Sequence, residues 1–275
     1  MPDKYTATWV SHSSMGDFLK CPRAYFLHNV YKNPNTGRKI NIISPSLALG
    51  AAIHEVLENL NNFSVEERMN HCNLERLENA WTKVSGKKGG FKNEDEETQV
   101  KNRAKEMIKR VMNNPGILAK KAIKMKQDLP NYFLSEDENI ILCGKIDWLS
   151  YIPEDDSIHV LDFKTGKHGE NEDSLQLPIY QLLLKNLQKR KVSGASYWYL
   201  DRDNEPISVN LPSVDDSYNR VIEIARKVKS ARESKTFICP KGGKGCFACQ
   251  PFEKILTGDA FYVGVGEYNQ DLYMI

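Results

Sequence analysis

The chain has 275 residues, of which 40% are hydrophobic and 27% charged, the composition of an ordinary globular protein that can bury a substantial core. No apolar run approaches the roughly 20 residues needed to cross a bilayer, and the N-terminal MPDKYTATWV lacks the apolar core of a signal peptide. These features argue against membrane and secreted proteins, and we expect a cytoplasmic protein with no membrane partner.

The net charge of +2 neither requires nor excludes a nucleic-acid partner, but the charges are unevenly distributed. Residues 83–128 contain 13 Lys and Arg against 6 Asp and Glu, a net +7, which leaves about −5 for the rest of the chain. A concentrated basic segment is suited to following a phosphate backbone. A solvated helical face is the commoner reason for such a cluster, and both explanations stay open.

Helical patterns dominate the chain up to about residue 113. A helix capped by Ser13 or Ser14 is predicted to run to about His28, and Pro22 within it predicts a kink or a break into two short helices. Residues 31–45 are predicted to be a loop.

Three more helical stretches are predicted after this loop. Ser46 opens a helix with several small residues, including Gly50, which allow another element to approach closely. More helix is expected at 64–84, then a mobile SGKKGG linker, then a long basic helix at 94–113.

From residue 131 the pattern changes to strand. Three successive strands are predicted at 131–136, 139–152 and 157–165, with acidic turns between them. The next elements are predicted to be a helix, two strands and a helix, at 174–188, 193–201, 206–211 and 214–234. The last 40 residues begin with a cysteine cluster and end in an irregular tail. This order predicts an α/β core with helical additions.

Two neighbouring strands carry carboxylates and a lysine, in GKIDWL and LDFKTG. Alternate residues of a strand face the same side, so Asp162 and Lys164 project together. If the strands form a hairpin, Asp147 can meet Asp162 at one end of the sheet, where converging carboxylates repel each other. Mg²⁺ would relieve this repulsion, and Lys164 could then orient water or stabilise a developing phosphate charge. Taken alone, Asp162 and Lys164 would be a modest surface ion pair.

Two helical features fit the same chemistry. His54, in GAAIHEVLE, could supply another metal ligand or hold a phosphate. Gln176 and Tyr180 stand four residues apart on one face of the helix that follows the lysine strand, where they could contact a nucleotide or the attacking water. Each feature alone is commonplace, and only their order and spacing together indicate phosphodiester hydrolysis.

In this order the motifs resemble the RecB-type branch of the PD-(D/E)xK nuclease superfamily over residues 13–250. GAAIHEVLE resembles its histidine helix, GKIDWL its metal-binding aspartate, LDFKTG its D-x-K motif and QLPIY its Q-x-x-x-Y helix. The resemblance implies a restriction-endonuclease-like α/β core, a mixed central sheet flanked by helices. It implies a single nuclease domain over 1–275, with a helical, basic insertion at 62–130.

The resemblance also assigns roles to individual residues. His54, Asp147, Asp162 and the backbone carbonyl of Phe163 would bind Mg²⁺ or Mn²⁺. Many members of the superfamily have Glu where Asp162 stands, but the Asp form is familiar in the RecB branch. The catalytic residue would be Lys164, supported by Gln176 and Tyr180.

Four of the six cysteines are arranged to bind metal. FICPKGGKGCFACQPF offers three thiolates, from Cys239, Cys246 and Cys249, and Cys21 in FLKCPRAYFL is the natural fourth. A cytosolic chain is not expected to form disulfides. Four thiolates suit Zn²⁺ or an iron–sulfur cluster, and the softness of the ligands does not decide between them.

The one-plus-three layout of these cysteines resembles the iron–sulfur subset of this family. That subset includes AddB-type helicase-nuclease domains, CRISPR-adaptation nucleases and related single-strand exonucleases. The resemblance implies a structural 4Fe–4S cluster that joins segments 13–28 and 236–250, with zinc as the alternative occupant. Cys72 and Cys143, in a helix and a strand pattern, are predicted to be inert buried thiols.

Together these features predict a metal-dependent deoxyribonuclease, an exonuclease acting on single-stranded DNA or DNA ends in repair or phage recombination. The basic segment around Lys101–Lys126 and the N-terminal helix would form the substrate channel. The chain contains no G-x-x-x-x-G-K-[ST] stretch, so a helicase partner would be another polypeptide. Two alternatives stay open: an end-trimming nuclease of CRISPR spacer acquisition that works with an integrase, and a non-catalytic DNA-binding module.

Overall fold

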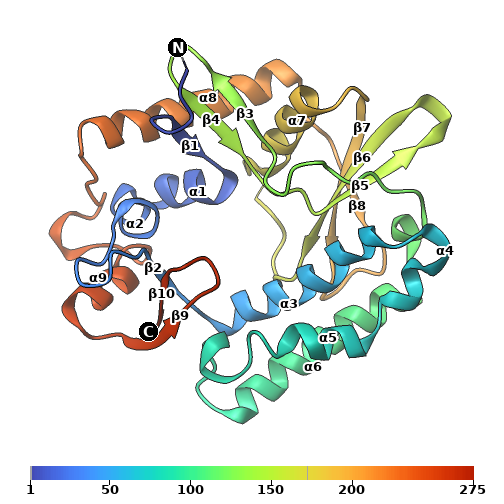
Figure 1. Cartoon of the computed structure of the whole chain (residues 1–275), viewed down its shortest axis with the longest axis horizontal. Helices are drawn as coiled ribbons and strands as arrows, with labels where there is room; N and C mark the ends of the chain where they lie inside the picture. The colour runs from blue at the N-terminus through green and yellow to red at the C-terminus, as the bar shows by residue number, and fades with distance from the viewer. Residues whose placement is uncertain (1, 172) are drawn as a thin grey trace. The chain divides into compact units, whose positions relative to one another are not determined.

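The computed structural model describes residues 2–171 and 173–275, and its contacts divide the chain into two units (Figure 1). Unit 1 contains the residues up to Ile43, together with Asn131–Gly144 and Val214–Ile275. Unit 2 contains Ser44–Pro130 and Lys145–Ser213. Both units mix helices with strands, which is consistent with the α/β class of a restriction-endonuclease-like fold.

The helices of unit 1 begin with α1 (His12–Lys20), α2 (Pro22–Tyr25) and a π-helical turn (Phe26–Val30). The predicted break at Pro22 is confirmed. The predicted cap is wrong, because Ser11 caps α1: its hydroxyl accepts from the Ser14 N–H at 3.2 Å and the Ser14 hydroxyl accepts from the Ser11 N–H at 2.9 Å. Unit 1 also contains α8 (Val214–Glu233) and α9 (Gln250–Thr257).

Unit 1 contains two three-stranded sheets. In the first, β4 (Ile140–Cys143) lies between β1 (Thr8–Val10), which is parallel to it, and β3 (Asn131–Ser135), which is antiparallel. In the second, β10 (Asp271–Met274) lies between β2 (Ile40–Ile42) and β9 (Phe261–Val265).

The second sheet corrects two sequence-based expectations, a loop at 31–45 and an irregular C-terminal tail. Its strands are too short to show an alternating pattern, and β2 finds its partner at the other end of the sequence. Asp271 is fully buried, and its carboxylate accepts hydrogen bonds from Thr36 Oγ1 at 2.6 Å and from Asn33 Nδ2 at 3.1 Å. These polar contacts tie the supposed loop to the supposed tail.

Helices make up the first part of unit 2: α3 (Pro45–Asn59), α4 (Val65–Arg68), α5 (Leu74–Trp81) and α6 (Glu94–Asn113). α3 packs against both α5 and α6, which lie side by side in Figure 1. Its cap is Ser44 rather than the predicted Ser46. Short 3₁₀ turns occupy Leu60–Asn62, Met69–His71, Gly86–Gly89, Gly116–Ala119, Pro153–Asp155 and, in unit 1, Gly242–Lys244.

Two further expectations for this helical region are wrong. The predicted helix at 64–84 is interrupted before Asn73, whose side chain caps α5. The predicted mobile linker is a packed 3₁₀ turn, in which the Gly86 N–H donates to Glu97 Oε2 at 2.9 Å and Gly89 is buried. A glycine-rich sequence indicates a flexible backbone, but the sequence alone does not reveal that contacts with other residues restrict that backbone.

The sheet of unit 2 has the strand order β5 (Trp148–Ile152), β6 (Ser157–Lys164), β7 (Val192–Tyr199) and β8 (Ile207–Val209). β5 and β6 form the expected antiparallel hairpin, and α7 (Gln176–Leu187) connects β6 to the parallel strand β7. The predicted strand at 139–152 is in fact two strands, β4 and β5, that join different sheets. A continuous apolar run cannot reveal such a division.

The core of unit 2 contains side chains from one face of β6. Leu161 and Phe163 pack with Ile53 and Leu57 of α3 in one apolar cluster. Because side chains alternate along a strand, Asp162 points to the other face and contacts Tyr180 of α7 at 3.2 Å. No helix among the residues described is both long and apolar enough to span a membrane.

Candidate active site and cysteine cluster

Asp147 and Asp162 meet at one end of the β5–β6 hairpin. The register pairs Trp148 with Leu161, so Asp147, just before β5, lies beside the end of β6. Asp147 Oδ2 accepts a hydrogen bond from the Phe163 N–H at 2.9 Å. Asp162 Oδ2 lies 2.8 Å from Lys164 Nζ, so these two side chains do project together. The hairpin thus places both carboxylates and the lysine at one site.

A first group of side chains surrounds Asp147. His54 Nδ1 lies 3.5 Å from Asp147 Oδ1 and 3.2 Å from Glu58 Oε1. One ligand atom from each of these three residues lies within 4.8 Å of the others, a spacing that suits a metal ion. Glu58 was not predicted, although its position one helical turn after His54 in HEVLE is a usable signal.

A second group surrounds Asp162 and is linked by hydrogen bonds. Asp162 Oδ1 accepts from Gln176 Nε2 at 2.5 Å and from the Tyr180 hydroxyl at 3.2 Å. Lys164 Nζ donates to Gln176 Oε1 and pairs with Glu170 Oε2 at 3.0 Å. Asp162 is not one of the three residues of the first group. Glu170 was not predicted, because it follows the strand in an irregular segment that carries no motif.

The environment of Asp162 favours its neutral form. Its side chain is 1% exposed, and burial together with the charge of Asp147 raises the pKa of Asp162 to about 7, although Lys164 and His54 act in the opposite direction. Asp162 Oδ2 is buried and lies within ion-pair distance of Lys164 Nζ, but it accepts no hydrogen bond with suitable geometry. A buried carboxylate oxygen with unused acceptor capacity is suited to a cation.

The environment of His54 favours its charged form. Burial disfavours the imidazolium, but the contacts with Asp147 and Glu58 outweigh burial and raise the pKa of His54 to about 10. Protonation of His54 and of Asp162 compensates an excess of negative charge, as a divalent cation would. The carboxylate oxygens suit both Mg²⁺ and Mn²⁺, and the imidazole nitrogen, once it has lost its proton, suits Mn²⁺ better than Mg²⁺, so the residues fit the metal predicted here.

A family model of the PD-(D/E)XK nuclease superfamily matches residues 9–251, which is most of the chain. The chain belongs to the PD-(D/E)XK nuclease superfamily. A comparison with curated proteins finds no match. Members of this superfamily are metal-dependent nucleases that act on DNA, and Asp162-Phe163-Lys164 has the form of the (D/E)XK element in the superfamily's name.

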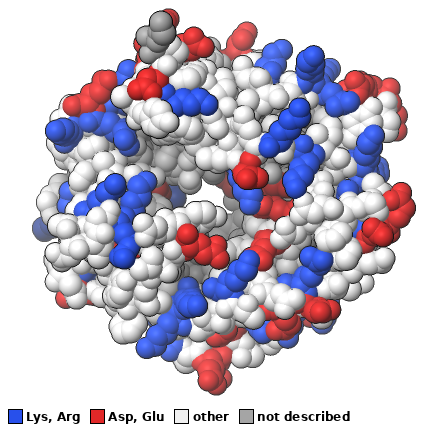
Figure 2. All heavy atoms as spheres, in the orientation of Figure 1, with Lys and Arg blue, Asp and Glu red and all other residues white. Residues whose placement is uncertain are grey.

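Several lysines and arginines of the basic segment predicted to form the substrate channel make ion pairs. Lys101 and Lys105 pair with Glu78 at 2.5 Å and 3.0 Å, and Arg103 pairs with Asp201 at 3.1 Å. Figure 2 shows positive and negative side chains interspersed over this face of α5 and α6. The solvated-face explanation therefore accounts for these charges, and a role of α6 in DNA binding stays a prediction.

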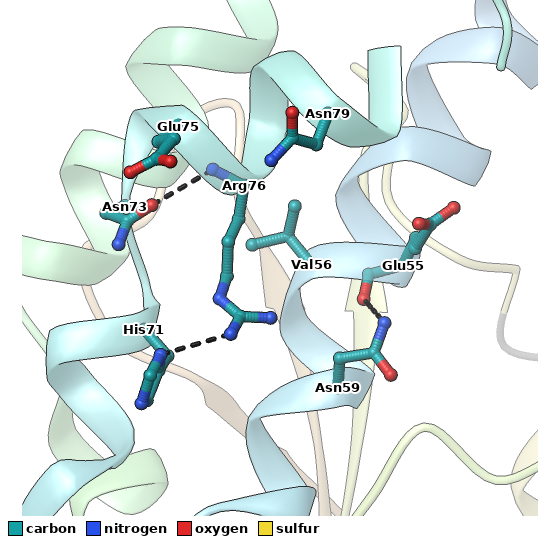
Figure 3. Close-up of a pocket in the computed structure, with 8 residues that line it drawn as sticks. All are labelled: Glu55, Val56, Asn59, His71, Asn73, Glu75, Arg76 and Asn79. Atoms are coloured by element: carbon teal, nitrogen blue, oxygen red, sulfur yellow. Dashed lines mark hydrogen bonds between the residues drawn. The ribbon is translucent and has the colours of Figure 1, made fainter. Parts of the chain in front are cut away.

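A polar pocket of about 330 Å³ lies between α3 and α5 (Figure 3). Arg76 extends into it and contacts His71 Nδ1 at 3.1 Å. Glu55 and Asn59 of α3 line it, one position beyond His54 and Glu58, and therefore on another face of the helix. None of the predicted site residues lines this pocket, so it is separate from the carboxylates.

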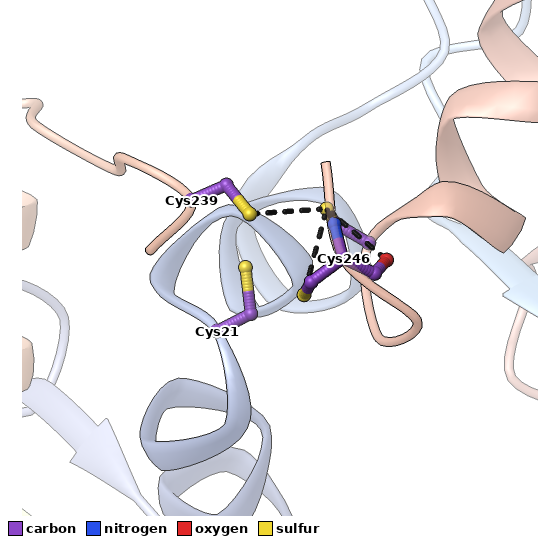
Figure 4. Close-up of side chains that lie close together, drawn as sticks. Cys21, Cys239 and Cys246 are labelled. Atoms are coloured by element: carbon purple, nitrogen blue, oxygen red, sulfur yellow. Dashed lines mark hydrogen bonds between the residues drawn. The ribbon is translucent and has the colours of Figure 1, made fainter. Parts of the chain in front are cut away.

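The four cysteines predicted to bind metal converge within unit 1. Cys21 lies between α1 and α2, Cys249 caps α9, and the other two lie in the loop before α9. Figure 4 shows the sulfur atoms of Cys21, Cys239 and Cys246 pointing toward one another. The sulfur atoms of the four cysteines all lie within 4.8 Å of one another.

The sulfur spacing carries information about the occupant. Cys249 Sγ lies 3.7 Å from Cys239 Sγ and 3.9 Å from Cys246 Sγ. Four thiolates bound tetrahedrally to one Zn²⁺ at roughly 2.3 Å would lie about 3.8 Å apart, which agrees with these distances. A cluster of four metals would need a wider spacing. The sulfur positions thus fit a single ion, whereas the cysteine layout was predicted to hold a 4Fe–4S cluster.

Local chemistry also suits these cysteines to metal binding. The backbone N–H of Cys249 lowers the pKa of Cys246 to about 7, because it donates to the thiolate, while burial raises the pKa of Cys21 to about 12. Gly245 has φ +70°, and a Cβ there would lie 3.2 Å from Cys249 Sγ, so glycine lets the loop pass close to the sulfur. Cys72 and Cys143 are buried outside this cluster and have raised pKa values, as expected for inert thiols.

Proposed function

We propose that unit 2 carries the site of a metal-dependent deoxyribonuclease of the RecB type, an exonuclease that acts on single-stranded DNA or DNA ends. The observation that carries this proposal is the buried Asp162–Lys164 pair beside Asp147 and His54, in a chain that matches the nuclease superfamily. The nuclease domain would span the chain, with 62–130 as its helical insertion.

The proposed ligands of the Mg²⁺ or Mn²⁺ are His54, Asp147 and Asp162, with the backbone carbonyl of Phe163. Glu58 joins them as a further carboxylate, because it shares the first group with His54 and Asp147. A bound cation would polarise the scissile phosphate and lower the pKa of a bound water.

Lys164 is the proposed catalytic residue. Burial disfavours its charge, but Asp162 and Glu170 outweigh burial and raise the pKa of Lys164, so the ammonium stays charged at neutral pH. A charged lysine cannot accept a proton from water, but it can orient the water and stabilise charge developing on the phosphate. Gln176 and Tyr180 position Asp162, since both donate to its Oδ1.

Glu58→Gln is expected to weaken Mn²⁺ binding about ten- to hundredfold, because it replaces an anionic donor with a neutral amide of the same shape. Isothermal titration calorimetry measures this directly, without DNA. Glu55→Gln is the matched control: it changes the same charge on α3, but Glu55 faces the polar pocket and pairs with Lys83 at 2.7 Å. Equal affinities for the two variants would remove Glu58 from the ligand set.

Mn²⁺ binding is expected to tighten as pH rises, because the metal displaces protons from its ligands. The pKa of Asp162 is about 7 and that of His54 about 10, so both groups lose protons on metal binding below pH 7. Between pH 7 and 10 only His54 releases one. The affinity should therefore rise roughly tenfold per pH unit above pH 7 and more steeply below it. An affinity independent of pH would show that neither Asp162 nor His54 loses a proton when the metal binds.

End-labelled single-stranded and double-stranded DNA with Mn²⁺ tests the proposed mode of action. An exonuclease releases mononucleotides or short products from the first time points, and blocking the free ends, for example by circularisation, protects the substrate. Internal fragments from circular single strands would instead show endonuclease action and overturn the exonuclease part of the proposal.

For unit 1 we propose a 4Fe–4S cluster on Cys21, Cys239, Cys246 and Cys249, with a structural role in joining α1 and α2 to the segment before α9. A bound cluster would act as a cross-link between these segments. The loop would have to open from the spacing that suits one ion. An adjoining cavity of about 600 Å³, lined in part by Gly242, Gly243 and Gly245, supplies room for this movement. Zinc is the second candidate, favoured by the sulfur spacing.

A further inference from the structure

A cleft of about 130 Å³ adjoins the proposed cation site within unit 2. Two of the proposed metal ligands, Glu58 and Asp147, form part of its wall. The remainder comes from the turn after α3, from the segment 123–130 and from residues 145–149. A group bound in this cleft would therefore touch the same carboxylates that face the cation.

Two lysines line this cleft. Lys145 Nζ pairs with Glu58 Oε2, and its side chain is 65% exposed. Lys124 Nζ donates to Asn62 Oδ1 at 2.6 Å and its side chain is also exposed. Asn61 and Gln127 add amides, and Asp128 is the one acid of the lining besides the two proposed ligands. Ammonium groups and amides are among the groups with which proteins contact phosphate.

The position of Lys145 relates this cleft to the reaction centre. Glu58 presents one oxygen to His54 Nδ1 at 3.2 Å and the other to Lys145. The ammonium thus contacts one member of the first group, and the carboxylate of Glu58 lies between it and His54. A phosphate on Lys145 would be a close neighbour of a phosphate bound at the cation, as successive phosphates of one strand are.

The lysines of the cleft differ from those of α6. Lys101 and Lys105 of α6 share Glu78, a carboxylate that none of the proposed ligands contacts. Their partner thus lies within the helical layer, whereas Lys145 forms an ion pair with Glu58, one of the proposed ligands. Lys124, near the end of the basic segment 83–128, lines the same cleft as Glu58 and Asp147, whereas no residue of α6 lines it.

We propose that this cleft binds the backbone phosphate next to the scissile phosphate, with Lys145 and Lys124 as its cationic residues. This inference rests on the proposed nuclease function, since only phosphodiester hydrolysis at the carboxylates defines a scissile phosphate. The ligand is a phosphodiester group of a DNA strand, recognised without regard to base sequence.

The test measures DNA affinity rather than cleavage. Lys164→Ala serves as the parent, so that a fluorescent single-stranded oligonucleotide stays intact in Mn²⁺, and anisotropy is recorded over a range of salt concentrations. Adding Lys145→Ala or Lys124→Ala should weaken binding and reduce the slope of log affinity against log salt by about 0.7 for each lost phosphate contact. Lys121→Ala is the control, an exposed lysine of the same segment that stacks on Tyr151 at 5.0 Å and does not line the cleft.

A neutral methylphosphonate moved along the strand locates the contact. One position should weaken binding by the parent and have no further effect on Lys145→Ala, since both changes remove the same contact. Salt slopes equal to that of the Lys121→Ala control would overturn the inference. It would also be overturned if Lys145→Ala lowered Mn²⁺ affinity alone, because Lys145 would then only hold Glu58.

The inference and the proposed function fail in different ways. If the wild type cleaves DNA and the cleft variants bind it like the control, only the cleft assignment is wrong. If the wild type neither binds nor cleaves DNA in Mn²⁺, the nuclease proposal itself is wrong and the cleft assignment falls with it.

Discussion

Lys164→Ala is expected to reduce Mg²⁺- or Mn²⁺-dependent DNA cleavage by about 10²- to 10³-fold, the range for loss of one preorganised donor. The lysine is held by Asp162 at 2.8 Å and Glu170 at 3.0 Å, so its ammonium is fixed before substrate binds. Alanine removes this charge and leaves Asp162 buried without its cation. Protonation of Asp162 offsets that cost, because the pKa of Asp162 is already about 7.

A control variant at a neighbouring lysine distinguishes a loss of catalysis from a loss of folding. Lys167→Ala removes the same charge three residues later, from an exposed side chain beyond the end of β6. Both variants should keep the thermal unfolding midpoint of the wild type to within a few degrees, as expected when about 1 kcal/mol or less is lost. Cleavage by Lys164→Ala at the rate of Lys167→Ala would mean that Lys164 is not catalytic.

Cys21→Ser is expected to release the metal of the cysteine cluster and to lower the thermal unfolding midpoint by at least about 10 °C, since metal binding contributes directly to folding. Cys21 is the one cysteine of the four that precedes α2, so its loss removes the metal-mediated link between the N-terminal helices and the C-terminal ligands. Iron and zinc contents of anaerobically purified protein provide the measurement. Brown, iron-containing wild type supports the 4Fe–4S cluster, and colourless protein with one zinc contradicts it.

Cys143→Ser is the matched control for the cluster. Cys143 is buried and its sulfur lies 3.5 Å from the Val10 carbonyl oxygen, a contact that a serine hydroxyl can also make. It lies outside the four-cysteine group, so metal content should stay at the wild-type level. Unchanged metal content and stability in Cys21→Ser would exclude Cys21 as a ligand.

Long amphipathic helices were predicted well from the sequence, because their signals are local. α6 (Glu94–Asn113) has the predicted bounds, with Asn93 as its cap and four acidic residues in its first turn. α8 ends one residue before the predicted end. The short strands β1, β2 and β10 were missed, because three or four residues carry no usable period and each strand depends on a partner far away in the sequence.

The parts of the site that depend on local spacing were predicted, and those that depend on long-range packing were not. The two-residue spacing of Asp162 and Lys164 and the four-residue spacing of Gln176 and Tyr180 are enough to place each pair on one face. The placement of His54 beside Asp147 depends on how α3 packs across the hairpin, which no local pattern contains. Glu170 lies in irregular backbone, and its contact with Lys164 could only be found from the structure.

We propose that the carboxylates at the end of the β5–β6 hairpin bind a divalent cation and that DNA is cleaved there. The most direct test adds Mn²⁺ to metal-stripped protein in the presence of labelled single-stranded DNA, for the wild type and for Asp162→Asn, which keeps the shape of the side chain and removes its charge. We predict cleavage by the wild type only after Mn²⁺ is added and none by Asp162→Asn. Cleavage without added metal, or equal cleavage by the two proteins, would show that this site is not a metal-dependent nuclease centre.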